Sequence, residues 1–234
     1  MLDDRELLDI HARALFRHDQ RARLLSVNEP WGEGAPAPRL YFGRTCAGNL
    51  WRLRADLPAG LAAELETLCA DEPKGAGLSG APRHADAYVR LLGAHGRVRR
   101  VEAGPAYRFT DYPEPSRVLL HVTETNAEVL RGGFEEMLEE LPFAQPFVAV
   151  LEEGRAVAVC RSVRVTTAAH EAGVETLPDF RGRGYATDVT AGWARLVRDA
   201  GAAPLYSTSW ENTASQSVAK RLCLLQYAAD FHVT

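Results

Sequence analysis

A glycine-rich loop between a strand-like and a helix-like segment is the feature that most constrains how this chain can fold. The loop lies within residues 174–187, which read V-E-T-L-P-D-F-R-G-R-G-Y-A-T. The first part has the character of a strand end, and a helix is expected to start directly after the second glycine. Such a turn leaves several backbone N–H groups unpaired at the positive end of a helix dipole. The segment is therefore predicted to bind a phosphate group.

Three alternatives for this loop imply different ligands. A dinucleotide-binding loop needs Gly-x-Gly-x-x-Gly near the first strand of a βαβ unit, but Thr187 occupies the third glycine position and the loop lies late in the chain. A P-loop needs Gly-Lys-Ser/Thr, which the sequence lacks. A structural turn explains the two glycines by their need for positive φ. It leaves the adjacent Arg181 and Arg183 unexplained.

Composition limits the partners that the chain is expected to bind. The 234 residues carry a net charge of -4, which argues against a nucleic-acid partner, because such proteins usually present a basic field. No apolar run approaches the ~20 residues of a membrane span, and the first six residues lack the apolar core of a signal peptide. We therefore expect no membrane partner and a cytoplasmic location.

The four cysteines are widely separated, at Cys46, Cys69, Cys160 and Cys223. This spacing contains no C-x-x-C pair and no set of zinc ligands. We expect reduced, mostly buried thiols and no bound metal.

A proline-rich segment divides the predicted elements into two groups. Pro113 and Pro115 lie within residues 110–116 and exclude helix and sheet interior there, so two domains are predicted, at 1–115 and 116–234. The N-terminal region is expected to contain helices at 4–25, 58–70 and 83–94, strands at 39–44 and 50–55, and extended chain at 97–109.

The C-terminal region has a more regular alternation of expected elements. Strands are predicted at 118–122, 147–151, 156–165, 173–177, 204–209 and 226–233, with helices at 127–141, after the glycine loop and at about 214–225. The predicted fold class is α/β (α+β), with a mixed, mainly antiparallel central sheet flanked by helices and preceded by an α/β N-terminal domain.

Two motifs in this order carry a family resemblance. Residues 181–186 fit Arg/Gln-x-x-Gly-x-Gly/Ala, and Glu211-Asn212-Thr213-Ala214-Ser215 follows the next strand. Residues 118–234 resemble the GNAT superfamily of acyl-CoA-dependent N-acyltransferases. The resemblance implies acetyl-CoA as co-substrate and direct transfer of its acetyl group, in a ternary complex, to a primary amine of a small molecule or peptide. The alternative is a catalytically silent CoA-binding sensor or assembly module. The first half is open to interpretation as a degenerate copy that closes the cleft or forms a homodimer.

The resemblance also implies which residues bind the cofactor. Backbone N–H groups of the loop cradle the CoA diphosphate, and Arg181 and Arg183 face phosphate. Backbone groups of Thr176 and Leu177 pair with the pantetheine arm, much as a sheet edge accepts a strand. Asn212 matches a position that contacts pantetheine, although Asn is equally suited to cap the following helix. The full expected set is Thr176, Leu177, Arg181, Gly182, Arg183, Gly184, Tyr185, Ala186, Thr187, Asn212 and Ser215.

The catalytic acid departs from the family pattern. Many members carry, seven residues after this Asn, a Tyr that protonates the departing thiolate, but here the position is Ala219. The usual Gly-Phe further on is replaced by Cys223-Leu224. Replacement donors left open by the sequence are Tyr206, Ser207, Ser209, Cys223 and Tyr227.

A base is needed if the acceptor arrives as an ammonium ion with a pKa near 10. Glu175 is the first candidate, because it lies beside the expected acyl position in a strand with apolar neighbours, where burial favours a base. The structural alternative is an ion pair with Arg161 or Arg164. His170 and Glu171 lie at the start of the same strand, where other members carry bases.

Overall fold

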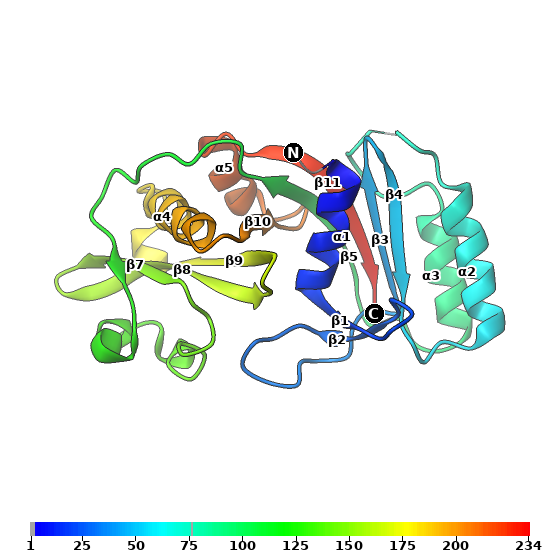
Figure 1. The fold of residues 1–234 in the computed structure, drawn as a ribbon, viewed down its shortest axis with the longest axis horizontal. Helices are drawn as coiled ribbons and strands as arrows, with labels where there is room; N and C mark the ends of the chain where they lie inside the picture. Colours follow the sequence, from blue (N-terminus) through cyan, green and yellow to red (C-terminus); the bar gives the residue numbers. More distant parts are fainter. Residues whose placement is uncertain (1–2, 76) are drawn as a thin grey trace.

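One large sheet organises the chain. The computed structural model of the protein describes residues 3–75 and 77–234. Nine of its strands form a single sheet in the order β4-β3-β11-β5-β10-β9-β8-β7-β6, and β1 and β2 form a separate hairpin (Figure 1). The elements are α1 (Asp4–Leu15), β1 (Phe16–His18), β2 (Leu24–Val27), β3 (Leu40–Thr45), β4 (Gly48–Leu53), α2 (Ala59–Asp71), α3 (Ala85–Ala94), β5 (Val101–Arg108), β6 (Leu120–His121), η1 (Glu124–Leu130), η2 (Glu135–Met137), β7 (Phe147–Glu152), β8 (Arg155–Val165), β9 (Ala169–Thr176), η3 (Pro178–Phe180), α4 (Tyr185–Asp199), β10 (Ala203–Ser207), α5 (Thr213–Arg221) and β11 (Leu225–Val233).

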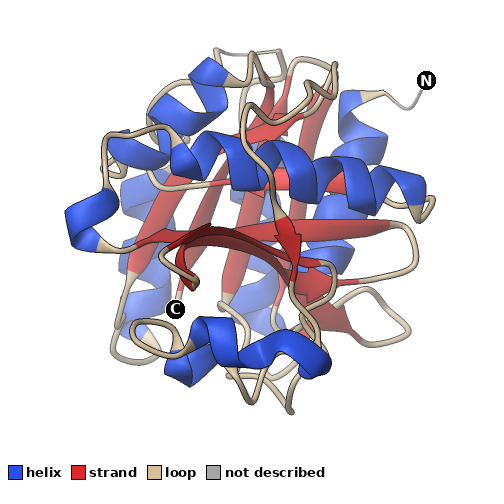
Figure 2. Cartoon of the chain, turned by 90° about the vertical axis from the view of Figure 1, so that its left-hand side faces the viewer, coloured by secondary structure: helices blue, strands red, loops and turns tan. Residues whose placement is uncertain are grey.

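The predicted fold class is confirmed. Within the described strands of the large sheet, β9 and β10 run parallel and every other neighbouring pair is antiparallel. Helices lie on both sides of the strands (Figure 2). The parallel pair lies between β5, from the first half of the sequence, and β8, from the second half.

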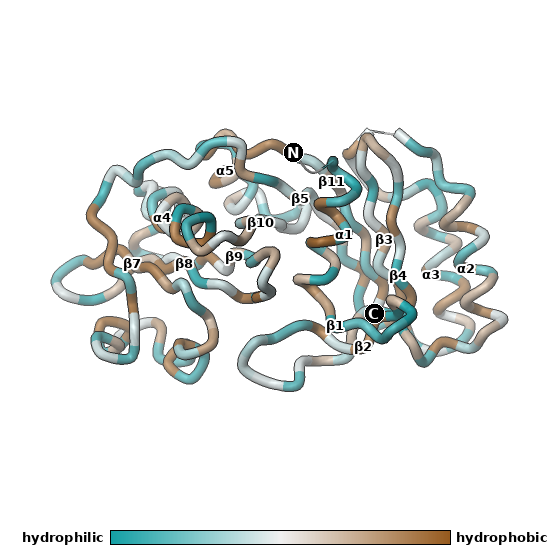
Figure 3. The backbone as a smooth tube through the Cα atoms, viewed as in Figure 1, coloured by the Kyte–Doolittle hydropathy of each residue, from teal (hydrophilic) through white to brown (hydrophobic). Residues whose placement is uncertain are grey.

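The two halves of the sequence share the sheet. β5, from the first half, lies between β10 and β11, and β11 also pairs with β3. The segment between β5 and β6 is irregular and mainly hydrophilic, and it contains the predicted boundary (Figure 3). The division into domains at 1–115 and 116–234 stays a prediction.

Apolar faces attach each helix to the sheet. Trp193 of α4 and Val218 of α5 are buried against one face of β7, β8 and β10. Leu8 of α1 is buried with Tyr41 and Tyr227, whereas Leu65 of α2 packs with apolar residues on the opposite face of β3 and β11. No helix in the described part of the chain is long and apolar enough to cross a membrane.

Two helix predictions are wrong in extent. The helix expected at 4–25 ends at Leu15, because the chain turns extended at Phe16 and forms the β1–β2 hairpin. The helix expected at 127–141 is replaced by the short 3-10 segments η1 and η2. Gly132 and Gly133 separate them, with φ of 90° at Gly132, which a continuous right-handed helix does not accommodate.

Candidate active site

The parallel strands β9 and β10 diverge and open a cleft. They pair from Ala169↔Ala203 to Glu171↔Leu205. Beyond this point the next residues of β10, Tyr206 and Ser207, pair only with β5 on the other side. Strands that separate in the middle of a sheet leave unpaired backbone groups along their inner edges.

The cleft has a volume of about 810 Å³ and joins the divergent strands to the glycine loop. It is lined by residues from β9, the loop, β10, α5 and the turn after η1: Gly133, Phe134, Ala172, Val174, Glu175, Thr176, Leu177, Pro178, Phe180, Arg181, Gly182, Gly184, Tyr185, Ala186, Tyr206, Ser207, Thr208, Asn212, Ala214, Ser215, Ser217, Val218 and Arg221. Most of the predicted site residues are thus brought together, whereas Arg183 and Thr187 lie outside this lining.

The glycine loop has the geometry that its sequence predicts. Gly182 and Gly184 have φ of 77° and 85°, and Gly184 is the N-cap of α4. The N–H groups of Thr187 and Asp188 donate to the carbonyl of Gly184. For residues 182–186, no acceptor of the N–H groups is found among the described residues. These groups meet at the positive end of a 15-residue helix, an arrangement that suits an anion.

The two loop arginines make contacts within the loop. Arg181 donates from Nε to the carbonyl of Thr176 at 3.2 Å and lines the cleft. Arg183 donates to the carbonyl of Asp179 at 2.9 Å, and its guanidinium lies over the ring of Phe180. Arg183 is not among the residues that line the cleft, and its contact with phosphate stays a prediction. Arg221, on the last turn of α5, contributes a cation to the lining that the sequence pattern had not indicated.

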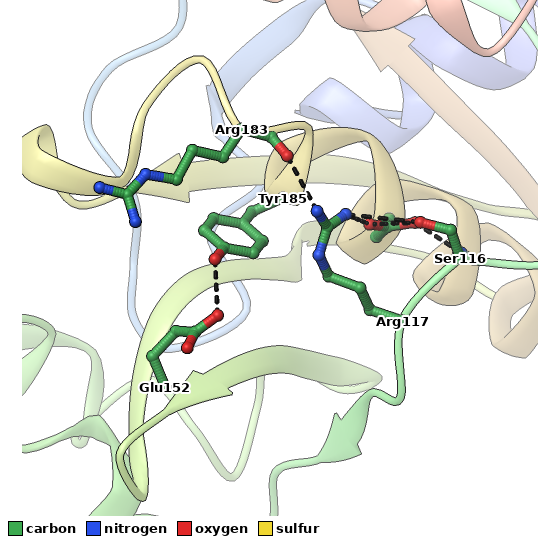
Figure 4. A network of polar contacts seen from close by, with 6 residues as sticks. Ser116, Arg117, Glu152, Arg183 and Tyr185 are labelled. Atoms are coloured by element: carbon green, nitrogen blue, oxygen red, sulfur yellow. Dashed lines mark hydrogen bonds and ion pairs between the residues drawn. The ribbon is translucent and has the colours of Figure 1, made fainter.

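A brace from outside the loop fixes its position (Figure 4). Arg117 donates to the carbonyl of Arg183 at 3.1 Å and also pairs with the buried carboxylate of Asp188 in α4. Asp188 further accepts from the backbone N–H of Ser116 at 2.7 Å. The hydroxyl of Tyr185 donates to Glu152 of β7 at 2.5 Å. The loop is thus held by the segment before β6 and by β7, a role for Ser116 and Arg117 that no local sequence signal indicated.

Backbone pairing distinguishes the two residues expected to contact pantetheine. Leu177 donates its N–H to the carbonyl of Val157 in β8, so the predicted backbone role of Leu177 in pairing with the cofactor is wrong for this N–H. Successive residues of a strand direct their backbone groups to opposite sides. The N–H groups of Val174 and Thr176 therefore point away from β8, toward the cleft. Leu177 contributes its side chain to the lining.

The following motif is built as a helix start. Asn212 accepts the N–H of Ser215 at 3.0 Å through its side chain and caps α5, which confirms the structural reading of this residue. Its lining position leaves the role in cofactor contact as a prediction. Ser215 shares a hydrogen bond with the hydroxyl of Tyr206 at 2.7 Å. Close approach of this segment to β5 depends on Gly104, because a Cβ there would lie 1.7 Å from the carbonyl oxygen of Thr208.

The replacement acids divide into two groups. Ala219 is fully buried beside Tyr206 in the core under α5. Tyr206 and Ser207 line the cleft, whereas Ser209, Cys223 and Tyr227 do not. Burial raises the pKa of Tyr206 to about 12, so its hydroxyl keeps its proton at neutral pH and can donate a hydrogen bond.

Glu175 lies at the cleft but in surroundings other than those expected. Its side chain is 48% exposed, and Arg161 donates to it at 2.8 Å. Arg161 also pairs with Glu140 at 2.9 Å. The expected burial among apolar neighbours is therefore wrong, because the outward position of Glu175 on β9 is satisfied by a cation from the adjacent strand. Its catalytic role stays a prediction.

Across residues 3–75 and 77–234, no group of three or more His, Cys, Asp or Glu side chains could hold a metal ion. The cleft is instead lined by backbone donors, hydroxyl groups and two arginines, Arg181 and Arg221.

Comparisons with known proteins agree with this geometry. The family model described as GNAT acetyltransferase matches residues 147–227, from β7 into β11. No curated protein matches the sequence. A GCN5-related N-acetyltransferase from Sphaerobacter thermophilus has a similar fold, with 14% identity, a TM-score of 0.50, and coverage of 86% of this chain and 78% of that chain.

Two further structures are similar over different spans. A GCN5-related N-acetyltransferase-like protein from Streptococcus suis shares 17% identity over 85% of each chain, with a TM-score of 0.49. An aminoglycoside N-acetyltransferase in complex with CoA shares 24% identity over 45% of this chain and 89% of that chain, with a TM-score of 0.34. The matched family segment contains the glycine loop, both diverging strands and the start of α5. Residues 147–227 of this chain therefore match a GNAT acetyltransferase domain.

Proposed function

We propose that this protein is an N-acetyltransferase that moves the acetyl group of acetyl-CoA directly to the primary amine of a small molecule or a peptide. The observation that carries the proposal is the single cleft that joins the unpaired N–H groups at the start of α4 to the gap between β9 and β10. A long ligand with a diphosphate at one end and an extended arm at the other fits both parts.

The proposed cofactor position follows from the donors available. The diphosphate binds the N–H groups of residues 182–186, with Arg181 and Arg221 as neighbouring cations. The pantetheine arm lies along β9 and pairs with backbone groups of Val174 and Thr176, as an added strand would. Asn212 and Ser215 border the arm from α5.

The proposed reaction is a direct transfer. The amine nitrogen attacks the thioester carbonyl carbon, whose oxygen is polarised by the N–H of Thr176. The attacking nitrogen of the resulting tetrahedral species gives up its extra proton to water. The carbon–sulfur bond then breaks, which leaves a neutral amide and a thiolate. Its intrinsic pKa is only moderately above neutral, so the thiolate can leave without a full proton transfer. Tyr206, on the cleft wall, supports the departing charge as a hydrogen-bond donor, in exchange for its hydrogen bond to the carbonyl of Ser215.

A base must first remove a proton from the ammonium form of the acceptor. Glu175 is the base proposed from the sequence, and its carboxylate borders the cleft. In this role it would exchange its ion pair with Arg161 for contact with the amine.

Turnover measurements test the proposal. Purified protein is mixed with acetyl-CoA and, in turn, spermidine, lysine, kanamycin and a short peptide with a free N-terminus, and the release of CoA thiol is followed. The proposal expects amine-dependent thiol release and an acetylated product of matching mass. Binding of acetyl-CoA with no turnover for any primary amine would instead support the silent binding module.

That second candidate rests on one specific observation. The position of the usual proton-donating Tyr is Ala219, which is fully buried and offers no polar atom. A sensor would bind acetyl-CoA and CoA without consuming either.

The cellular setting belongs to the same proposal. All four cysteines are free thiols, which fits a reducing compartment such as the cytoplasm. The shared sheet further suggests that the N-terminal half borders the acceptor side of the cleft, either within one chain or across a homodimer.

A further inference from the structure

A chain of polar side chains runs from the cleft into the N-terminal half of the protein. Ser207, which lines the cleft, donates from both its backbone N–H and its hydroxyl to Glu171 Oε1, each at 2.7 Å. Glu171 Oε2 lies 2.9 Å from His11 Nε2. His11 Nδ1 lies 2.7 Å from the hydroxyl of Tyr227. Four residues from α1, β9, β10 and β11 thus form one continuous array.

Glu171 occupies the point where the parallel ladder ends. Its backbone pairs with Leu205, but Ser207, two residues further, has no partner on β9. The carboxylate of Glu171 takes the N–H of Ser207 that would otherwise lack an acceptor on this side. Glu171 therefore both ends the ladder and places a negative charge directly behind the cleft wall. Because it is only 4% exposed, this charge needs a partner.

His11 is that partner, and its position is set by the capped and buried first turns of α1. Asp3 and Glu6 form a reciprocal cap, and the apolar Leu7 and Leu8 anchor the helix. His11 itself is fully buried. Burial alone lowers the pKa of His11, but attraction and hydrogen bonding to Glu171 outweigh it, and the net pKa is raised. The charged and titratable groups around the array are Glu171 of β9, Tyr227 and Asp230 of β11, Tyr41 of β3, Arg164 of β8 and Asp4 of α1.

The array orients the Ser207 hydroxyl so that its oxygen can accept a hydrogen bond. Its proton is directed at Glu171 Oε1, so its oxygen lone pairs are free to accept a hydrogen bond from the cleft. A ligand N–H is the matching donor. The Ser207 hydroxyl is hydrogen-bonded to the buried carboxylate of Glu171. It therefore binds a protonated nitrogen more strongly than a neutral one, because the negative charge lies just behind the hydroxyl.

We propose that Ser207 contacts the acceptor amine and that its ammonium proton passes through this hydroxyl to Glu171, with His11 as the positioning residue. This inference rests on the proposed N-acetyltransfer and adds to it the N-terminal half, since α1 supplies His11. The nitrogen gives its proton to Ser207 Oγ as Ser207 gives its own proton to Glu171 Oε1. The products are a neutral amine with a free lone pair, an unchanged Ser207 and a neutral Glu171 carboxyl group. No electrons are exchanged.

The contacts favour Glu171 over Glu175 as the final proton acceptor. Both side chains lie on the same face of β9, since they are four residues apart in a strand. Glu175 is about half exposed and held by Arg161, an arginine that also serves Glu140. Glu171 is buried and already bonded to a cleft-lining hydroxyl, and its partner His11, unlike an arginine, can lose its positive charge.

The test compares Glu171→Gln and Ser207→Ala with Glu175→Gln, which removes the competing base candidate of the same strand. The control is Glu153→Gln, in the exposed turn between β7 and β8 and outside the cleft lining. Gln at 171 keeps an oxygen that can accept the Ser207 N–H. The hydrogen bond at the end of the β9–β10 pairing is therefore kept, while the carboxylate is lost. The measurements are the Kd of acetyl-CoA by calorimetry and kcat/KM for the best amine of the panel between pH 7 and 9.5.

The proposal expects a loss in transfer without a loss in cofactor binding. In Glu171→Gln and Ser207→Ala, kcat/KM at pH 7 falls by about 10²-fold, the usual contribution of one acid–base group. The Kd of acetyl-CoA stays within about twofold, because these changes leave the loop intact. Glu175→Gln loses less of its kcat/KM than Glu171→Gln does, and the control Glu153→Gln changes kcat/KM by less than about threefold.

The pH profile separates a proton-transfer role from a structural one. The fraction of unprotonated amine rises by about tenfold per pH unit below its pKa near 10, so the defect of Glu171→Gln shrinks steadily as the pH rises. A pH-independent defect, or a larger loss in Glu175→Gln, overturns the relay and leaves the proposed function standing. Wild-type protein that binds acetyl-CoA but acetylates no amine overturns both.

Discussion

Arg117 lies over the ring of Tyr185, with its guanidinium carbon 4.6 Å from the ring centroid. The contact joins the irregular segment before β6 to the first turn of α4 (Figure 4). The same guanidinium binds the carbonyl of Arg183 and the carboxylate of Asp188. A single side chain thus ties the glycine loop to the first turn of α4.

Replacing Arg117 by Ala should therefore loosen the loop. Asp188 is buried and loses one of its partners, which costs about 1–3 kcal/mol in the free energy of unfolding. CoA affinity should fall by about tenfold, equivalent to 1.4 kcal/mol. Calorimetry and urea unfolding measure the two effects. The control is Arg198→Ala, which removes a similar contact over the ring of Tyr112 at the other end of α4 and should leave CoA affinity unchanged.

Gly184→Val should abolish CoA binding at a modest cost in stability. Gly184 has φ of 85° at the N-terminus of α4, and Gly201 has φ of 84° beyond its C-terminus. Gly201→Val is the control, because valine in this conformation costs about 1–3 kcal/mol in the free energy of unfolding at either position. The rise in Tm caused by CoA should disappear only in Gly184→Val. Equal CoA protection in both variants would mean that the start of α4 does not hold the cofactor.

Gly104→Ala should displace the segment that follows β10, because this segment packs closely against Gly104 of β5. The new Cβ would meet the carbonyl oxygen of Thr208, a backbone atom that moves only with the segment carrying Asn212. We expect a loss of at least about 2 kcal/mol in the free energy of unfolding, in the range of overpacked positions. Gly60→Ala in α2, where the added methyl group meets open space, should instead stabilise by up to about 1 kcal/mol.

The buried His11 should make stability depend on pH with a defined sign. Its folded-state pKa is raised above the ordinary value of 6.5, so the stabilisation from its proton is fully present below pH 6.5 and is lost as the pH rises through the raised pKa. Urea unfolding of wild type and His11→Gln from pH 5.5 to 9 isolates this contribution. The difference between the two proteins should shrink with rising pH, and a difference that grows would contradict the assignment.

Local chemistry explains what could be predicted from the sequence. The glycine loop and the cap at Asn212 depend on neighbouring residues, so their form could be read from short motifs. The residues expected to bind CoA lie together for the same reason, with the exceptions of Arg183 and Thr187. The prediction of a helix at 127–141 is wrong, because it follows the apolar spacing and neglects the break that Gly132 and Gly133 introduce.

Long-range pairing explains what the sequence could not reveal. The insertion of β5 between β10 and β11 joins strands from opposite halves of the chain, and no local pattern specifies such a neighbour. The contact of His11 with Glu171 depends on that arrangement and links residues 160 positions apart, from 11 to 171. Glu175 was the more visible base in the sequence because it is adjacent to the loop.

The most direct test of the account is a calorimetric titration of the wild-type protein with acetyl-CoA, followed by ATP and NAD as competitors. The cleft at β9 and β10 and the N–H groups of residues 182–186 predict one site per chain that binds acetyl-CoA and is displaced by CoA. ATP and NAD, which lack the pantetheine arm, should compete only weakly. Absence of binding heat and of any Tm increase with acetyl-CoA, or tighter binding of NAD or ATP, would contradict the central claim.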